Sequence, residues 1–134
     1  MERIQERSLK ILHNDYTSNY QMLLEKAGTT TLLIRRLRLL AICVFKSIHS
    51  VNPAYLNNLY ELKTSNYEMR NVASLVQPKV RTTHYGLRSA RYVGSKIWNI
   101  LPNHFKEMVD LQSFKNIIST WEGPNDNDSY SYYI

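Results

Sequence analysis

Basic and aromatic side chains are interleaved from Val80 to Pro102, a stretch that reads VRTTHYGLRSARYVGSKIWNILP. No Asp or Glu occurs anywhere between Met69 and Lys106. Guanidinium and ammonium groups neutralise phosphates, and aromatic rings stack on unpaired bases. The pattern therefore indicates binding to nucleic acid, through Lys79, Arg81, Tyr85, Arg88, Arg91, Tyr92 and Lys96.

The aromatic residues of this stretch also fit a hydrophobic core. In a small domain, aromatic side chains are more often buried than used as stacking surfaces. We therefore favour a core position for Trp98, whereas Tyr85 and Tyr92 fit either role because a tyrosine can bury its ring and keep its hydroxyl in water. The arginines have no carboxylate close by in sequence, so we expect them to face solvent, a partner, or acids from elsewhere in the chain.

A second group of cations, Arg35, Arg36 and Arg38, opens the run RRLRLLAICVF. We expect these three to form another phosphate-contacting group. Arg36 lies closest to the apolar stripe of this run, so a buried ion pair is the alternative for it. The formal charge of +6 is unevenly distributed: residues 1–34 hold four bases and four acids, residues 35–100 eleven and two, and residues 101–134 two and five.

The residue types that usually carry catalysis or bind metals do not have the spacing that such sites require. The four aspartates, Asp15, Asp110, Asp126 and Asp128, do not form the close carboxylate pair that holds two metal ions in a polymerase. The histidines have no metal-ligand spacing to one another or to Cys43, and the glycines form no phosphate-binding loop. We therefore expect no catalytic residue, no metal and no cofactor.

Most of the chain that must position the basic and aromatic side chains has the apolar spacing of α-helices. The pattern predicts helices over residues 3–13, 18–27, 31–50, 53–59, 94–100 and 111–121. The first places Ile4, Ser8, Ile11 and Leu12 on one face. The buried stripe of the third is predicted as Leu33, Leu37, Leu40, Ala41, Val44, Phe45 and Ile48.

Helix ends carry recognisable signals. Asn14-Asp15 is expected to end the first helix, Thr17 or Ser18 to cap the second, and Gly28 to stop it in a left-handed conformation. Thr30 or Thr31 is expected to cap the third helix. Asn52-Pro53 and Asp110 are predicted to start later ones.

Residues 60–92 lose the helical period, because Pro78, Gly86 and scattered β-branched residues interrupt it. This segment is predicted to be irregular or a two-stranded β-hairpin. The sequence thus predicts a mainly α fold: one small helical domain over residues 1–121 and a disordered tail over 122–134.

Five blocks occur in the order and spacing of a known family. They are RIQERSLKILHND (3–15), SNYQMLLEKAG (18–28), RRLRLLAICVFKSIHSVNP (35–53), the Arg81 to Pro102 block with Tyr85-Gly86, Arg91-Tyr92 and Trp98-Asn99, and Phe114-Lys115 with Trp121. In these blocks the chain resembles the region that follows the polymerase palm in reverse transcriptases of jockey-like non-LTR retrotransposons. The resemblance covers about residues 3 to 123.

The resemblance implies a thumb-like, non-catalytic accessory region that binds RNA or an RNA–DNA hybrid beside the palm and fingers of a full-length polymerase. Two departures matter. After Trp121 the chain reads GPNDNDSYSYYI from Gly123 onward, without the cysteine cluster that ends many relatives, so no terminal zinc knuckle is expected. The palm, with its Tyr-x-Asp-Asp motif, and an endonuclease domain are also missing.

Two other hypotheses remain open. The chain also fits an inactive remnant of a transposable element, whose helices would expose apolar faces made for a missing palm. It equally fits a small module that binds an acidic protein through its basic surface. No apolar run is long enough to cross a bilayer and no signal-peptide core is present, so we expect an intracellular, non-membrane location.

Overall fold

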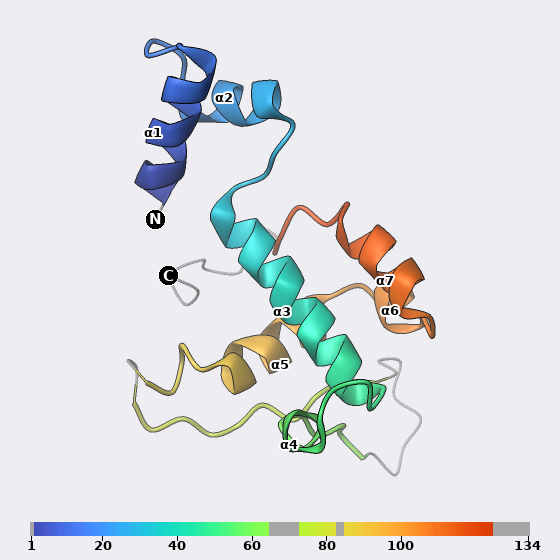
Figure 1. Ribbon diagram of the computed structural model, residues 1–134. Coiled ribbons are helices and arrows are strands. Elements are labelled where there is room, and N and C mark those ends of the chain that lie inside the picture. Colours follow the sequence, from blue (N-terminus) through green and yellow to red (C-terminus); the bar gives the residue numbers. More distant parts are fainter. Residues whose placement is uncertain (1, 65–72, 83–84, 125–134) are drawn as a thin grey trace. The chain divides into compact units, whose positions relative to one another are not determined.

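The computed structural model describes residues 2–64, 73–82 and 85–124. Its elements are helices (Figure 1): α1 Glu2–His13, α2 Tyr20–Ala27, α3 Leu32–Ile48, α4 Ala54–Asn57, α5 Ala90–Ile100, α6 Asn103–Lys106 and α7 Leu111–Ile118. The predicted mainly α fold is confirmed. The chain divides into two compact units, Met1–Arg36 and Leu37–Ile134, which are described separately. This division leaves the prediction of one domain over residues 1–121 untested.

The first unit is a pair of helices packed through leucines. Leu9 of α1 is buried against Leu23 and Leu24 of α2, and Tyr20 and Ala27 cover the same cluster. The apolar face predicted for α1 lies on the outside instead, and its larger members are exposed to solvent: Ile4, Ile11 and Leu12.

Hydrogen bonds decide which face of α1 turns inward. Glu2 accepts a hydrogen bond from the backbone N–H of Leu33 at 2.9 Å, and Gln5 accepts one from that of Leu32 at 3.2 Å. Tyr20 donates its hydroxyl to Glu2 at 2.6 Å. These carboxylate and amide groups satisfy the first N–H groups of α3, which have no partner within their own helix. The inner face of α1 therefore combines the buried Leu9 with the half-buried polar side chains of Glu2 and Gln5.

The turn between α1 and α2 is built around Asp15. As predicted, α1 ends before Asn14, which has a left-handed φ of 49°. The predicted cap at Thr17 or Ser18 is wrong, because both side chains donate to the Asp15 carboxylate and Asn19 precedes α2. Gly28 ends α2 with a φ of 60°, as predicted.

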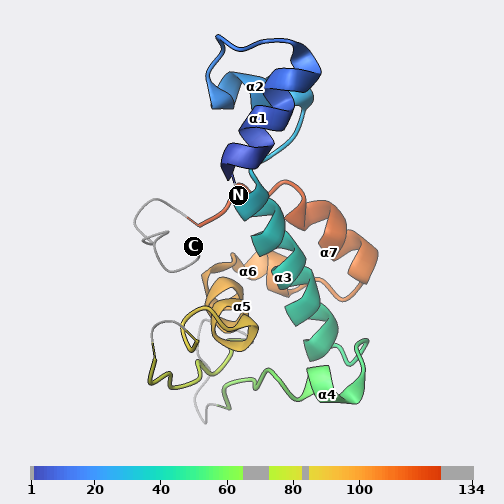
Figure 2. The same cartoon turned by 60° about the vertical axis from the view of Figure 1, so that its left-hand side comes forward.

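Three aromatic rings form the centre of the second unit. Phe45 of α3 stacks on Phe114 of α7 with ring centroids 4.3 Å apart, and Trp98 of α5 lies 6.5 Å from Phe45 and 6.0 Å from Phe114. Figures 1 and 2 show α3 between α5 and α7. Trp98 is 1% exposed, so its predicted core position is confirmed.

The long helix α3 follows its predicted pattern closely. The hydroxyl of Thr31 accepts a hydrogen bond from the N–H of Ile34 at 3.3 Å, as the cap prediction required. Within the predicted stripe four residues are fully buried and three are half-buried. The buried ones are Leu37, Ala41, Val44 and Phe45, and the half-buried ones are Leu33, Leu40 and Ile48.

Asn52 does not cap α4, contrary to prediction. Its side-chain amide donates to the Cys43 carbonyl at 3.1 Å and to the Ser47 hydroxyl at 2.9 Å, so it binds back to the end of α3. Pro53 occupies the position before α4.

The predicted short β-hairpin is not found in the part of the chain that the structure describes. An isolated antiparallel bridge joins Leu62 and Leu75. The outward backbone groups of Leu75 pair with the side chain of Asn99: its N–H donates to Oδ1 at 2.8 Å and its carbonyl accepts from Nδ2 at 3.0 Å. Trp98 donates to the Ala73 carbonyl at 2.8 Å. Side chains of α5 thus take the place of a further strand. The described parts of this segment are irregular up to Ser89, as the alternative prediction had it, but its last three residues belong to α5.

The last helices differ from prediction mainly in length. Helix α5 begins at Ala90, four residues before the predicted start at Gly94, because Ser89 caps it. Asp110 caps α7 as predicted, accepting the Ser113 N–H at 2.9 Å. Most of the predicted disordered tail, residues 125–134, lies outside the described residues.

Candidate nucleic-acid interface

The predicted basic residues ahead of α5 lie at the surface of the second unit. Five of the predicted residues form what we call the α5 surface, and all five are exposed: Lys79, Arg81, Tyr85, Arg88 and Arg91. The Tyr85 side chain is 83% exposed. Tyr92 and Lys96, in α5 itself, are half-buried. The structure therefore brings two arginines and an exposed aromatic ring to the start of one helix.

The arginines of the α5 surface are not paired with carboxylates of the described residues. The ion pairs seen there, Lys10 with Glu6 and Lys26 with Asp15, both belong to the first unit. Within residues 2–64, 73–82 and 85–124, no carboxylate competes with an added anion for the guanidinium groups of Arg81, Arg88 and Arg91.

The start of α5 adds to this positive potential. Arg88 and Arg91 flank the cap residue Ser89, and the first turn contains no acid. The N-terminal end of a helix carries a partial positive charge, so cations placed there weaken the helix by about 0.3–1 kcal/mol each. The same arrangement favours a bound phosphate. The two arginines thus suit anion binding better than they suit the stability of α5.

A close backbone contact shapes the loop that carries Tyr85. Gly86 donates its N–H to the Thr82 carbonyl at 3.1 Å, and Ser89 donates its N–H to the Gly86 carbonyl at 3.2 Å. A Cβ at position 86 would lie 2.6 Å from the Thr82 oxygen and 2.7 Å from the Val80 Cβ. Glycine is therefore required where the loop crosses itself.

Tyr60 holds the first turn of α5 against the core. Its hydroxyl donates to the Ala90 carbonyl at 3.0 Å, and its ring fills the space above Gly94. Burial raises the pKa of Tyr60 to about 12. The phenol therefore stays protonated and keeps donating at neutral pH.

Arg38 makes a side-chain hydrogen bond to a part of the chain that is distant in sequence. Its Nε donates to the Trp121 carbonyl at 2.8 Å, and its side chain is half-buried. Burial lowers the pKa of Arg38, and the charge of Glu122 partly opposes that effect. Arg38 thus ties α3 to the segment that follows α7, with part of its guanidinium already occupied.

Arg35 and Arg36 are both exposed and belong to the first unit, whereas Arg38 belongs to the second. Burial raises the pKa of Glu2, but hydrogen bonds from Tyr20 and Leu33 and the charge of Arg36 lower it on balance. Arg36 therefore acts electrostatically on Glu2 from an exposed position. Because Arg36 is exposed, the alternative prediction of a buried ion pair for this residue is wrong.

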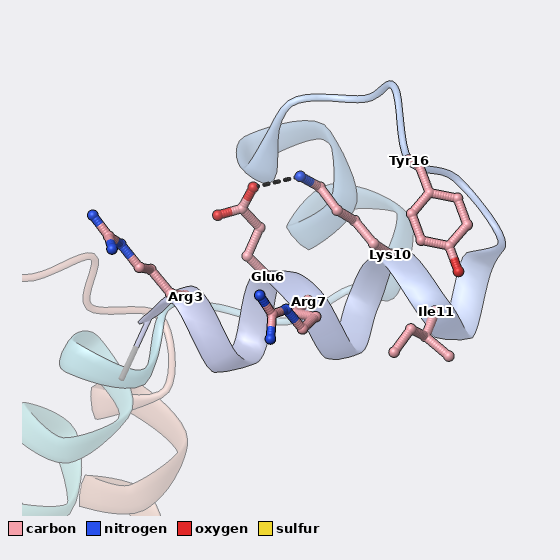
Figure 3. Close-up of a pocket in the computed structure, with 6 residues that line it drawn as sticks. All are labelled: Arg3, Glu6, Arg7, Lys10, Ile11 and Tyr16. Atoms are coloured by element: carbon pink, nitrogen blue, oxygen red, sulfur yellow. Dashed lines mark ion pairs between the residues drawn. The ribbon is translucent and has the colours of Figure 1, made fainter.

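One basic surface escaped the sequence prediction. Arg3, Glu6, Arg7, Lys10, Ile11 and Tyr16 line an open pocket of about 510 Å³ on α1 (Figure 3). The balanced charge of residues 1–34 concealed it, because a count along the chain does not show which acids are used in folding. The spacing of Arg3, Arg7 and Lys10 on one helix face was the available signal.

Among the described residues no group of three or more His, Cys, Asp and Glu is arranged to hold a metal ion, and no helix is long and apolar enough to cross a membrane. Comparison of the chain with protein-family models, curated proteins and solved structures finds no match.

Proposed function

We propose that this chain is a nucleic-acid-binding, non-catalytic region that binds single-stranded RNA or an RNA–DNA hybrid through the α5 surface. The proposal includes the origin that the sequence blocks imply, the post-palm region of a jockey-like non-LTR retrotransposon reverse transcriptase. In that setting the palm and fingers of a longer polymerase carry out the chemistry.

The observation that carries this proposal is the combination at the start of α5. Arg88 and Arg91 are exposed without a described carboxylate partner, and Tyr85 presents an exposed ring a few residues ahead of them. Phosphate contacts supply affinity that depends steeply on salt, and an aromatic face adds stacking with unpaired bases. The side chains for both kinds of contact occur within one short segment.

The test is a fluorescence-anisotropy titration of the full chain with single-stranded RNA, an RNA–DNA hybrid and heparin over a series of salt concentrations. Replacing Arg81, Arg88 and Arg91 together with alanine should lower RNA affinity. It should also flatten the log-log salt dependence by about 0.7 for each phosphate of a single strand that is no longer neutralised.

A charge-matched pair of variants separates a local site from general attraction. Arg88→Ala/Arg91→Ala and Lys63→Ala/Lys115→Ala each remove two exposed cations from the second unit. We expect only the first pair to weaken RNA binding strongly. Equal losses of affinity in both pairs would contradict a defined interface.

The heparin titration distinguishes the other hypotheses. RNA binding that persists at a salt concentration that abolishes heparin binding supports stacking or geometric contacts. Equal, weak and fully salt-sensitive binding to all three ligands would favour an inactive remnant. Tight binding to one acidic protein, without preference for RNA over heparin, would favour a protein-interaction module.

A further inference from the structure

We propose that the first unit carries a second binding site, the α1 pocket, which takes one unpaired nucleotide of a single-stranded RNA. Arg3, Arg7 and Lys10 would contact its phosphates, and Tyr16 with Ile11 its base. The inference rests on the proposed function in assigning RNA as the ligand, but it uses different residues, in the other unit.

The cations of the α1 pocket share one helix face. Arg3, Arg7 and Lys10 are spaced four and three residues apart, a spacing that aligns side chains along an α-helix. Of the described residues that line the pocket, Glu6 is the one acid, and it pairs with Lys10 at 2.7 Å. Figure 3 shows this pair beside Arg7, with Arg3 and Tyr16 at opposite ends of the row. Three cations thus face a single carboxylate.

The remaining acids of the first unit do not neutralise these cations. Asp15 accepts hydrogen bonds from Thr17 and Ser18 and pairs with Lys26, and Glu2 accepts from Tyr20 and from the N–H of Leu33. Glu25 lies on α2 and does not line the pocket. Folding therefore turns a segment with balanced charge into one with a locally basic face.

The pocket also offers apolar surface for a base. Tyr16 and Ile11 are 65% and 63% exposed, although both are large hydrophobic side chains. The backbone on either side of Tyr16 is fixed, because Asn14 adopts a left-handed φ and the Asp15 carboxylate accepts the N–H groups of Thr17 and Ser18. An aromatic ring held by an ordered turn loses little conformational freedom when it stacks.

The size of the pocket favours a single nucleotide. Its volume of about 510 Å³ falls within the range of roughly 300–1,000 Å³ that is usual for small-ligand sites. A base can lie against Tyr16 only when it is unpaired, because the faces of a base in a duplex are already stacked. The neighbouring cations suit the phosphates on either side of it.

The decisive experiment is photocrosslinking of the full chain to an oligouridylate RNA that contains one iodouridine, followed by peptide mapping. We expect a crosslink at Tyr16. In anisotropy titrations with the same RNA, Tyr16→Ala should lower affinity roughly tenfold to a hundredfold, the range expected when one base no longer stacks. Tyr16→Phe should retain the affinity, because the ring and not the hydroxyl makes the contact.

Tyr55→Ala is the matched control, since Tyr55 is an exposed tyrosine of α4 in the second unit, and it should leave affinity unchanged. Arg3→Ala/Arg7→Ala should reduce the salt slope by about 0.7 for each phosphate that is no longer neutralised. Tyr16 is exposed, so circular dichroism should show that Tyr16→Ala remains folded.

The outcomes separate this inference from the proposed function. Crosslinks confined to residues 79–96, with unchanged affinity of Tyr16→Ala, would overturn the α1 pocket and leave the α5 surface standing. A weaker affinity in Tyr16→Ala but not in Arg81→Ala/Arg88→Ala/Arg91→Ala would support the pocket and refute the α5 assignment. Absence of RNA binding would refute both.

Discussion

Carboxylates hold the turns and helix ends of the first unit, whereas mostly uncharged side chains hold those of the second. In the first unit, Asp15 organises the turn between α1 and α2, and Glu2 binds the start of α3. In the second unit, Asn99, Trp98 and Tyr60 make the corresponding bonds to backbone groups.

This difference affects how many charges remain for a ligand. A carboxylate used in folding leaves one acid fewer to neutralise nearby arginines, so the first unit keeps a basic α1 pocket despite its balanced composition. The second unit uses few acids in folding, Asp110 at the cap of α7 being one, because neutral groups make most of the corresponding bonds. The two basic surfaces therefore arise in different ways.

The largest expected loss of stability comes from replacing Trp98, one of the uncharged side chains that hold the second unit together. Trp98→Ala removes the central aromatic side chain and its bond to the Ala73 carbonyl, and should lower the free energy of unfolding by about 3–5 kcal/mol. Chemical denaturation followed by Trp121 fluorescence measures this decrease. Trp98→Phe should be less destabilising, because it keeps most of the packing of the ring.

Substitution of Asn99 tests whether its side-chain amide takes the place of a neighbouring strand in pairing with the backbone of Leu75. Asn99→Ala leaves the N–H and carbonyl of Leu75 without the amide and should cost about 2–3 kcal/mol. Asn99→Asp keeps the acceptor for the Leu75 N–H but places a carboxylate oxygen against the Leu75 carbonyl, so its cost should decrease at acidic pH, where the protonated carboxyl group can donate. Hydrogen exchange at the Leu75 amide gives a local readout, and unchanged protection in Asn99→Ala would contradict this role.

The contact between α5 and Tyr60 should show a smaller effect. A Cβ at Gly94 would lie 2.5 Å from the Tyr60 hydroxyl oxygen and 2.9 Å from its Cε1. Overpacking costs about 1–3 kcal/mol, and the helix preference for Ala over Gly returns up to about 1 kcal/mol. Gly94→Ala should thus destabilise the second unit by about 1 kcal/mol in thermal or chemical unfolding.

A double-mutant cycle with Tyr60→Phe isolates the steric part of this effect. Removing the hydroxyl also removes the closest clash, so Gly94→Ala should cost less in the Tyr60→Phe background. Strictly additive changes in stability would mean that the hydroxyl is not what requires a glycine.

Acidification should weaken the first unit through Asp15. Hydrogen bonds from Lys26 and Ser18 hold the pKa of Asp15 below its ordinary value. A carboxylate with a lowered pKa stabilises the folded state above its unfolded pKa of about 3.9, and this contribution is lost as the pH falls through the folded pKa. We expect a small decrease of helical signal below about pH 4.

Asp15→Asn is the control for this pH dependence. The variant should be less stable at neutral pH and should lack the part of the acid transition that Asp15 causes, as followed by circular dichroism. In the second unit Asp110, whose pKa is lowered by hydrogen bonds from Ser113, contributes a similar effect at the cap of α7. Asp110→Asn separates the two contributions.

Local signals predicted the structure correctly at several positions where a residue acts on its own helix. Gly28, Thr31 and Asp110 end or begin helices as predicted, because these preferences depend on backbone conformation and on N–H groups one turn away. The stripe of α3 follows for the same reason, since a periodic apolar face is a property of the helix itself.

Bonds to groups outside a residue's own helix account for the errors. Asn52 and Ser18 have the residue types of helix caps, but each found its partner elsewhere, on α3 and on Asp15 respectively. The Arg38 side chain also donates to the Trp121 carbonyl, 83 residues away, a contact that the sequence analysis did not predict. A hydrogen-bond partner so distant leaves no trace in local spacing.

The sequence by itself determined that the chain is mainly helical, where several helices begin and end, and that residues 79–96 are rich in cations without acids. Only the tertiary structure decided which of those cations are exposed, which face of α1 packs inward, and that Arg3, Arg7 and Tyr16 share a pocket. The physical reason is that charge and burial depend on which groups meet in space. Composition counts the acids, but only folding shows which of them are already bound.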